Sequence, residues 1–548
     1  MKIHLQIWLW IAAILSGVFP MSAYDFQTDG IYYGLNGEEA TVVQGDTPYS
    51  GDVVIPSSVS YDGNTYSVTA IGETAFESCS ELTSIALPNT VTTIGYSAFY
   101  NCSSLASVSM GNSVTSIEVH AFFLCSSLAS ITLPASVTSI ETDAFLSCAN
   151  LEEIIVAEGN NSYSSVDGVL YDKNKTVLLK CPDKKSQVTI PSSVTTIENG
   201  AFTSCHGLTS IEIPNSVKSI SSQAFFSCRN LTTVSIGNSV TAIGNGAFSN
   251  CTSLEEIIVA EENPSYSSVE GALYNKDQTV LSKWPDKKLN VSIPNSVTAI
   301  GNCAFEYCSE LTSITLPESV TTIGEWAFSR CSGLTSIDIP HAVKNIGYQA
   351  FSYCNNLTSI SIGNSVIVIG DYAFENCNSL TLVAMGNSVS AIGNHAFSGC
   401  SSLPSITLPA SVTRIGANAF WRCNNLQKIY SWPQNPPEIT FNTFSIDHYI
   451  SSTLYIPTGC KSKYEANQHW YNFMNVVEIQ SSVDEIDRQE LHIYVVDRTL
   501  HVENDGAAYR VYSASGKAVY AGNATTLSLA PGVYVVCTDN DVQKVLVK

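Results

Sequence analysis

The sequence has little charge and very little positive charge. Only 13% of its 548 residues are charged, and 48 acidic residues against 25 basic ones give a net charge of −23. Such an acidic chain repels phosphate backbones and anionic membrane surfaces. We therefore expect no nucleic-acid partner, and a surface made mostly of uncharged polar residues such as serine, threonine and asparagine.

Long apolar runs are absent beyond the N-terminus, so we expect no membrane span there. The first 23 residues combine one lysine, an apolar run over residues 7–19, the helix-breaking Pro20 and small residues up to Ala23. This pattern predicts a signal peptide, residues 1–23. A signal anchor is the alternative, but the apolar run is shorter than the ~20 residues that a span needs. The expected location is extracellular or on the outer cell surface.

Catalytic, cofactor and zinc motifs are missing as well. The sequence has no nucleophile elbow, phosphate-binding loop, His-Glu-x-x-His pair, dinucleotide fingerprint or CxxC pair. The adjacent glutamates Glu152-Glu153 and Glu255-Glu256 lie on expected strands and point to opposite faces, whereas glycoside hydrolysis needs two carboxyls facing one substrate. We expect no catalytic residue, no metal, no cofactor and no enzymatic activity.

What the sequence does contain is one unit repeated thirteen times. An Ala-Phe dipeptide recurs every 23 residues within three blocks, and two steps of 57 residues separate the blocks. Such fixed-period similarity is typical of a solenoid, in which each unit buries its apolar face against its neighbours. The repeat phenylalanines are Phe76, Phe99, Phe122, Phe145, Phe202, Phe225, Phe248, Phe305, Phe328, Phe351, Phe374, Phe397 and Phe420.

The unit reads L-T-S-I-x-L-P-x-S-V-T-x-I-G-x-x-A-F-x-x-C-x-x, as over residues 82–104. Its alternating apolar residues predict a short strand that ends at a proline such as Pro88 or at a Gly-Asn pair. A second extended piece follows over residues 91–94. Ala-Phe-x-x-Cys then fits a single short helical or 3-10 turn. Stacking the units places leucine on leucine, phenylalanine on phenylalanine and cysteine on cysteine.

The pattern L-x-x-I-x-L…L/V-x-x-I…A-F-x-x-C resembles bacterial leucine-rich repeats of the BspA-like family, from about Leu82 to Ile429. It differs from ordinary leucine-rich repeats in having proline or glycine where those carry a ladder-forming asparagine. The resemblance implies a mainly β fold, a right-handed solenoid of 13 repeats over residues 71–430 with a parallel concave sheet. It also implies a bacterial surface protein that adheres to host proteins or other cells.

Thirteen of the 17 cysteines occupy the same position of the repeat. A disulfide framework is one interpretation for an exported protein. We favour the other, a column of buried thiols that pack as small apolar side chains. Side chains of stacked units point in parallel, which suits poorly a disulfide dihedral angle of roughly ±90°, and an odd number of cysteines cannot all pair.

Two similar insertions, at about 158–191 and 261–294, separate the blocks. In each, two strand-like pieces flank a polar turn, which predicts a β-hairpin. We interpret the hairpins as covers for a step in the solenoid, with ligand-gripping arms as the alternative. Their Asp-Lys-Lys ends are expected to concentrate positive charge. Residues 24–70 and 431–483 break the period and are predicted to cap the ends of the solenoid.

The last part of the chain, residues 484–548, changes character. Alternating apolar residues and turns predict a small all-β sandwich. The segments YSASGK at 512–517 and PGVY at 531–534 and the ending KVLVK resemble the C-terminal sorting domain of the type IX secretion system. This resemblance implies that the secretion machinery recognises the segment, and that the chain crosses the outer membrane, often with removal of this domain and attachment to the cell surface.

Candidate ligand contacts lie at the outward positions of the first strand in each unit. Hydroxyl groups dominate these positions, with few charges and almost no aromatic residues, so they offer weak contacts distributed along an extended partner. Alternatively, the hydroxyls only keep the sheet soluble. The predicted ligand-binding residues of the concave face are Thr209, Ser210, Thr232, Thr233, Thr312, Ser313, Thr335, Ser336, Thr358 and Ser359.

The predicted function is an adhesin that binds host matrix proteins or other cells through an extended repeat surface. A non-catalytic carbohydrate-binding surface protein is the alternative, for which a cluster of exposed aromatic residues would be expected. The partner is thus an extracellular protein or a glycan.

Overall fold

The computed structural model describes residues 24–141 and 143–479 and, further on, seven strands between residues 492 and 547. The chain divides into two compact units, one of Met1–Ile456 with Cys460–Val477 and one of Pro457–Gly459 with Glu478–Lys548. The predicted signal peptide, residues 1–23, lies outside the described residues. Within the described ranges, no helix has both the length and the hydropathy needed to cross a bilayer.

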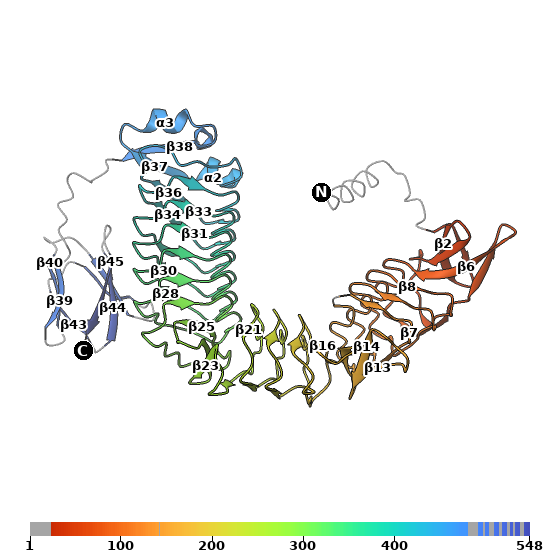
Figure 1. The fold of residues 1–548 in the computed structure, drawn as a ribbon. Helices are drawn as coiled ribbons and strands as arrows, with labels where there is room; N and C mark the ends of the chain where they lie inside the picture. Colours follow the sequence, from red (N-terminus) through yellow and green to blue (C-terminus); the bar gives the residue numbers. More distant parts are fainter. Residues whose placement is uncertain are drawn as a thin grey trace. The chain divides into compact units, whose positions relative to one another are not determined.

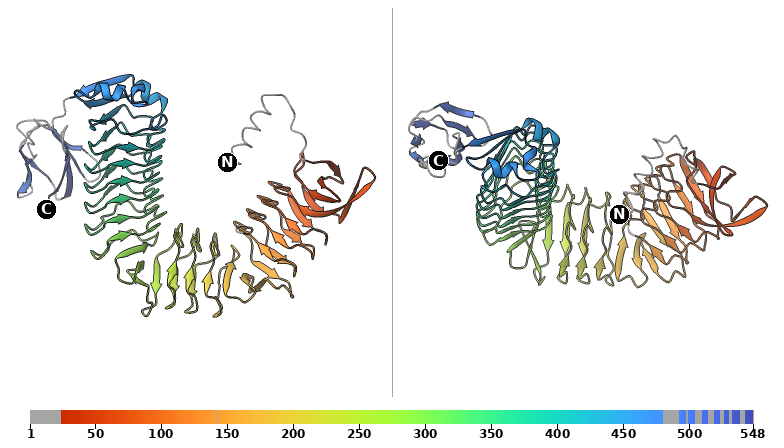
Figure 2. Two further views of the ribbon diagram at one scale, coloured as in Figure 1. Left: turned by 45° about the horizontal axis from the view of Figure 1, so that its top comes forward. Right: turned by 90° about the horizontal axis from the view of Figure 1, so that it is seen from above.

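Successive coils of the first unit lie side by side in Figures 1 and 2, and most regular coils contribute two short strands to two different parallel sheets. Strand partners are residues 23 apart, so that Ile211 pairs with Val234 in one sheet and Ile346 with Ile369 in the other. The short strands follow from the sequence, because in most coils a proline or a Gly-Asn pair ends the first strand and a glycine follows the second. The predicted mainly β solenoid of stacked parallel coils is confirmed.

The first strands of the coils, which contain the L-T-S-I segment, form five sheets. Their strands are β4 (Gly51–Val54), β7 (Leu82–Ala86) and β9 (Ser107–Ser109); β11 (Ser130–Leu133) and β13 (Glu153–Val156); β18 (Ser210–Ile213), β20 (Thr233–Ile236) and β22 (Glu256–Val259); β28 (Ser336–Asp338), β30 (Ser359–Ser361) and β32 (Leu382–Ala384); and β34 (Ser405–Leu408), β36 (Lys428–Ser431), β37 (Thr453–Pro457) and β38 (Asn475–Ile479).

The second strands form three longer sheets, and the N-terminal strands join the first of these. The members of the first are β1 (Phe26–Thr28), β2 (Ile31–Asn36), β3 (Glu39–Val42), β5 (Ser58–Tyr61), β6 (Asn64–Ile71), β8 (Thr93–Ile94), β10 (Ser116–Ile117) and β12 (Ser139–Ile140). The others comprise β16 (Val177–Lys180), β17 (Thr196–Ile197), β19 (Ser219–Ile220) and β21 (Ala242–Ile243), then β25 (Val280–Lys283), β26 (Ala299–Ile300), β27 (Thr322–Ile323), β29 (Asn345–Ile346), β31 (Val368–Ile369), β33 (Ala391–Ile392) and β35 (Arg414–Ile415).

The Ala-Phe-x-x-Cys segment is a series of turns rather than a 3-10 helix in the described residues of the repeats. Some N–H groups do donate to the carbonyl oxygen three residues earlier, as in a 3-10 helix; the Cys102 N–H donates to Phe99 in this way. Two residues per coil with positive φ interrupt them, for example Ser97 at 51° and Asn101 at 58°. A left-handed residue cannot continue a right-handed helix, so the chain bends back toward the next coil.

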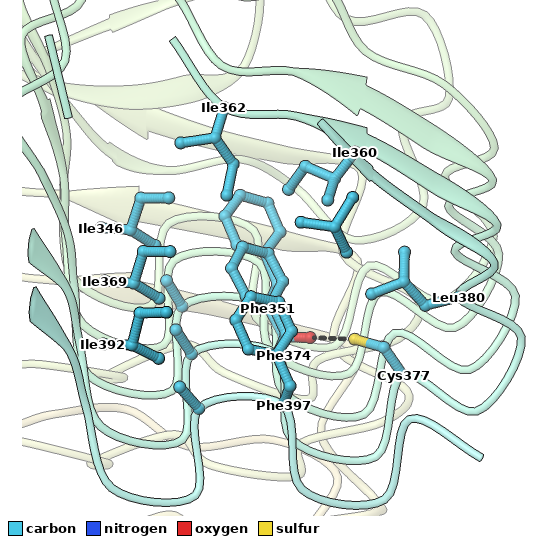
Figure 3. Packing of buried hydrophobic residues seen from close by; sticks show 14 of the residues in the cluster. Ile346, Phe351, Ile360, Ile362, Ile369, Phe374, Cys377, Leu380, Ile392 and Phe397 are labelled. Atoms are coloured by element: carbon cyan, nitrogen blue, oxygen red, sulfur yellow. Dashed lines mark hydrogen bonds between the residues drawn. The ribbon is translucent and has the colours of Figure 1, made fainter. Parts of the chain in front are cut away.

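The interior is filled by columns of identical side chains. Figure 3 shows Phe351, Phe374 and Phe397 one above another beside the column of Ile346, Ile369 and Ile392. Phe374 is fully buried, with its ring centroid 5.3 Å from that of Phe351 and 5.1 Å from that of Phe397. Burial of each such ring is worth about 1.5–3 kcal/mol. We call the column of repeat phenylalanines the phenylalanine stack.

The repeat cysteines are buried free thiols, as predicted; all sixteen cysteines in the described part of the chain are free. Twelve of the thirteen are also hydrogen-bond donors in the coil interior, which the sequence did not suggest, whereas Cys79 Sγ accepts from the Tyr49 N–H. Cys377 Sγ donates to the carbonyl oxygen of Phe351 over 3.2 Å, and nine other repeat cysteines make the same bond to the coil before them. Burial raises the pKa of the Cys423 thiol to about 12, which keeps it protonated.

The two inserts contain the predicted hairpins, each preceded by an additional strand. The first is β14 (Tyr163–Val166), β15 (Val169–Asp172) and β16, and the second is β23 (Tyr266–Val269), β24 (Ala272–Asn275) and β25 (Figure 1). The last strand of each insert pairs in parallel with the next coil. An insert therefore supplies a further, irregular coil and does not merely cover a step.

Buried side chains form three clusters that meet at the inserts. The clusters cover residues 26–170, 169–273 and 272–473. Leu170 and Val169 of the first insert belong to adjacent clusters, as do Leu273 and Ala272 of the second. The shared interior predicted from the repeats is thus continuous within a block and changes its side chains at each insert.

Aromatic residues continue the phenylalanine stack at both ends. Tyr49 lies 4.4 Å from Phe76, and Phe444 lies 5.1 Å from Phe420, measured between ring centroids. Trp470 and Phe473, both nearly fully buried, pack against Phe444. The C-terminal end also holds the short helices α2 (Ile446–Ser451), α3 (Lys461–Glu465) and η1 (Trp470–Asn472). These contacts keep the apolar ends of the stack out of water.

The described strands of the second unit form two antiparallel sheets, as predicted for a small all-β domain. They are β39 (His492–Val496), β40 (Thr499–Glu503) and β43 (Thr526–Ser528), and β42 (Ala518–Gly522), β41 (Tyr509–Ser513), β44 (Gly532–Cys537) and β45 (Val542–Val547).

Candidate ligand-binding surface

The ten predicted contact residues form what we call the Thr-Ser face, and the structure divides them between two regions. Thr209, Ser210, Thr232 and Thr233 belong to β18 and β20 or precede them directly, whereas the other six lie in or beside β28 and β30, beyond the second insert. Thr232, Thr233 and Ser359 are partly buried, and the other seven are exposed. The Thr-Ser face is therefore two short patches of hydroxyls and not one uninterrupted row.

In three of the five pairs, the hydroxyl of the first residue is engaged within the solenoid. Thr335 Oγ1 donates to the Thr312 carbonyl over 3.2 Å, and Thr358 Oγ1 donates to the Thr335 carbonyl over 3.0 Å. Thr232 Oγ1 donates likewise to the Thr209 carbonyl. The hydroxyl hydrogen of these threonines stabilises the coil-to-coil ladder, which leaves only oxygen lone pairs for a ligand. The second position, with Ser336 and Ser359 paired in register, is the better candidate for contact.

Near the N-terminal end, a carboxylate joins hydroxyls of the same kind. Thr83 Oγ1 and Ser84 Oγ both donate to Asp52 Oδ1, over 2.8 and 2.6 Å. These two bonds stabilise the charged form and lower the pKa of Asp52 below its usual value. The hydroxyl positions can thus bind a carboxylate oxygen.

The predicted positive patches at the insert ends do not form, because glutamates pair with the lysines. Lys184 Nζ lies 2.6 Å from Glu152 Oε1, and Lys287 Nζ lies 3.0 Å from Glu310 Oε1. Both pairs are exposed and each contributes little stability. Together with Glu255, Glu256 and Glu270, Lys287 lines an open cleft of about 470 Å³. In the described ranges, no group of three or more His, Cys, Asp or Glu side chains is placed to hold a metal ion.

Aromatic residues gather on a surface that the sequence reasoning missed, which we call the turn edge: the residues within three positions of each repeat phenylalanine. In the third block, Trp326, Tyr348, Tyr372 and His395 form a row in which neighbouring ring centroids are 5.2, 5.6 and 4.6 Å apart. These residues occupy variable positions of the repeat. Aligning the thirteen units and comparing their variable columns would have revealed them.

A second aromatic group lies four positions further along the same turns. The Arg330 guanidinium carbon lies 5.3 Å from the ring centroid of Tyr307 and 4.6 Å from that of Tyr353, which is cation–π geometry. Trp, Tyr and Arg are the residue types that dominate tight interfaces. The Thr-Ser face has none of them, so the turn edge of the third block offers the stronger anchors.

The repeat region matches the family model described as BspA type leucine rich repeat region, in six copies. The matched residues are 62–166, 177–276, 286–403 and 367–490, which together span most of the chain. The matched residues include the three blocks of repeats and most of each insert. No curated protein matches the sequence.

Three solved structures illustrate the similarity. A leucine rich cell surface protein from Faecalibacterium prausnitzii is 29% identical, with 76% of this chain and 96% of that one covered and a TM-score of 0.42. A leucine-rich repeat protein from Bacteroides ovatus is 31% identical, with 75% and 95% covered and a TM-score of 0.36. The pneumococcal vaccine antigen PcpA is 19% identical, with 83% and 98% covered and a TM-score of 0.38.

Family membership is established by the match of the repeat region to the family model. The matched residues are those whose leucines, isoleucines, phenylalanines and cysteines form the interior columns described above. On this evidence the chain belongs to the BspA-type leucine-rich repeat family.

Proposed function

We propose that this protein is a secreted or cell-surface adhesin, which binds host matrix proteins or other cells through its repeat surface. The observation that carries the proposal is the repetition of the same hydroxyl groups from coil to coil, in register, as for the exposed Ser336 and the partly buried Ser359. A surface of this kind contacts an extended partner at many points, and many weak contacts add up to firm attachment. Such a protein needs no catalytic residue.

Export is supported by the sequence. Residues 1–23 have the pattern of a signal peptide. Residues 484–548, whose described strands form two antiparallel sheets, resemble a type IX sorting domain, and we propose that they direct the chain to the outer cell surface. Membership of the BspA-type family supports the same location, because resemblance to that family implies a bacterial surface protein.

The test is capture of matrix proteins and of intact cells by the full chain immobilised on beads. We expect saturable capture that falls at least tenfold when Ser336 and Ser359 are both changed to arginine, since two large charged side chains would cover the hydroxyl row. Thr335→Val with Thr358→Val is the matched control, because it removes only the internal hydroxyl bonds. Absence of capture of any matrix protein or cell by the unaltered chain would refute the adhesive function.

A further inference from the structure

We propose that the turn edge of the third block binds a neutral glycan chain. This inference rests on the adhesive function proposed above and names the chemical class of its ligand. It moves the strongest contacts from the Thr-Ser face to the row formed by Trp326, Tyr348 and Tyr372.

The first argument is that tryptophan and tyrosine occur two residues before the repeat phenylalanine only in the third block. The position two residues before the repeat phenylalanine carries Trp326 and Tyr372 in the third block, but Gly200, Gln223 and Gly246 throughout the second. The first block has a group of a different composition, in which Tyr96 lies 6.0 Å from His120, and Phe123 lies 5.1 Å from His120 and 5.3 Å from Tyr100. The coil therefore folds without an aromatic residue at this position, and the rings of the third block are not needed to build it.

The second argument is that these rings occupy an unfavourable backbone conformation. Trp326 and Tyr372 have φ values of 53° and 59°. A left-handed conformation costs about 1–2 kcal/mol for a residue with a side chain, and glycine and asparagine adopt it most readily. The two rings are only partly buried, so core packing does not compensate for this cost. The left-handed conformation recurs at this position in every regular coil, so it belongs to the fold, and the backbone itself gives no preference for a bulky ring there.

The third argument is the chemistry beside the rings. Tyr348 is 37% exposed. Gln349 Oε1 accepts a hydrogen bond from Trp326 Nε1, and Asp371 accepts hydrogen bonds from the backbone N–H and the side-chain amide of Asn394. A sugar ring presents C–H groups that stack on an aromatic face and hydroxyls that donate to carboxylates and amides. Rings flanked by carboxylate and amide oxygens suit this combination.

The charges favour a neutral glycan. Asp371 and Glu375 lie beside the row, and the whole chain carries a net charge of −23. Both would repel a sulfated or sialylated chain. Arg330 lies over the neighbouring tyrosines and adds a positive charge to the same edge, which disfavours a strongly basic ligand.

The backbone argues against an extended peptide as the occupant. A peptide that adds a strand needs unpaired backbone groups on its host. Here the N–H groups of Trp326, Tyr353 and Tyr372 already donate to carbonyl oxygens of the next coil. The side chains remain available, and they recur at the coil spacing, which is similar to the length of one sugar ring in an extended chain. The row thus provides successive platforms for successive sugars.

The test compares two asparagine substitutions at the same position of the repeat. Tyr372→Asn removes a ring of the row and His120→Asn is its match in the first block, where φ is 58°. Both are measured as full chains on an array of neutral oligosaccharides, together with Tyr348→Ala. We expect Tyr372→Asn and Tyr348→Ala to weaken binding at least tenfold and His120→Asn to leave it unchanged. Asparagine favours the left-handed conformation, so Tyr372→Asn should not lower the melting temperature.

Capture of a matrix glycoprotein before and after enzymatic deglycosylation separates this inference from the adhesive function. Loss of capture on deglycosylation, with the same loss for Tyr372→Asn, supports both. Capture that survives deglycosylation and tolerates Tyr372→Asn overturns the glycan site and keeps the adhesin. Sensitivity to Tyr372→Asn with the deglycosylated protein would show that the edge binds polypeptide, and overturns the inference. Array binding without capture of matrix protein or cells keeps the site and overturns the adhesin.

Discussion

Coils of the blocks and coils of the inserts close the same interior with different side chains. At the position of the repeat phenylalanine, the first insert has Cys181 and the second has Trp284, and their N–H groups donate to the Ala201 and Ala304 carbonyls as a repeat phenylalanine does. Trp284 stacks on Phe305 with 5.9 Å between centroids, whereas Cys181 offers no ring to Phe202. The backbone of a coil is thus specified more strictly than the side chains that fill it.

Both inserts leave space beside the neighbouring regular coils, whichever side chain stands at this position. Beside the first insert, a pocket of about 140 Å³ lies between Phe145, Tyr163, Leu170 and Leu179. The second insert has its own pocket, of about 240 Å³, beside the equivalent Tyr266 and Leu273. Regular coils place identical residues against each other and pack densely, and the mismatch between a regular and an irregular coil leaves space.

Each insert coil also buries an ion pair where a block coil has only uncharged side chains. Lys180 Nζ lies 2.7 Å from Asp183 Oδ1, and Lys283 Nζ lies 2.5 Å from Asp286 Oδ1. The second carboxyl oxygen of each aspartate is buried without a hydrogen-bond partner. Burial outweighs the nearby ammonium group and raises the pKa of Asp286 to about 6. The inserts show that the fold tolerates a costly arrangement where the repeat is interrupted.

The largest expected effect is on the free energy of unfolding, and it compares a ring in a block coil with the smaller side chain at the same position of an insert coil. Phe374→Ala removes a ring that contacts a ring on each side, and we expect it to lower the free energy of unfolding by about 4 kcal/mol. Cys181→Ala, at the same position of an insert coil, should cost only about 1 kcal/mol because less volume is lost. Urea unfolding of the full chain measures both. Equal losses would show that the ring stack does not dominate the interior.

The next effect concerns the buried charges. Asp286→Ala leaves the Lys283 ammonium group buried without its carboxylate, and we expect a loss of about 3 kcal/mol. The double variant Lys283→Met with Asp286→Leu removes both charges and should return close to the unaltered stability. A double variant as unstable as Asp286→Ala would mean that the pair itself, and not the burial of a lone charge, holds the insert.

The smallest expected effect extends the comparison to the C-terminal end, where a neutral histidine completes the packing. His448 Nδ1 accepts from the Ser445 N–H, and Nε2 donates to the Cys423 carbonyl over 2.8 Å, so the ring is fixed as the neutral tautomer. Burial lowers its pKa below the usual 6.5. The unfolded chain therefore takes up the proton first, and this contribution to stability is present above pH 6.5 and lost below it.

We expect acidification below pH 6.5 to destabilise the unaltered chain by on the order of 1 kcal/mol more than His448→Gln. Glutamine keeps one acceptor and one donor without titrating in this range. Melting temperatures of both chains at several pH values measure the difference. Parallel pH profiles for the two chains would contradict the assignment.

The sequence predicted the solenoid well because its interior repeats. Columns of leucine, isoleucine, phenylalanine and cysteine follow from the period alone, and so does the parallel arrangement of buried thiols. The candidate site was predicted less well. Thr335 and Thr358 looked like ligand contacts, but their hydroxyls bond to the preceding coil. A threonine hydroxyl can bond either to the preceding coil or to a ligand, and only the distance between coils in the folded chain shows which bond forms.

The sequence by itself determined the stacking of coils, because one unit cannot enclose its own apolar residues and an identical neighbour can. The tertiary structure alone decided which polar and aromatic side chains meet. Trp326 and Tyr372 are 46 residues apart in the chain, yet they belong to one row, because Tyr348 of the coil between them contacts both rings. Lys184 and Lys287 of the inserts are likewise paired with glutamates of other coils. Side-chain neighbours between coils depend on register and turn geometry, which the order of residues does not display.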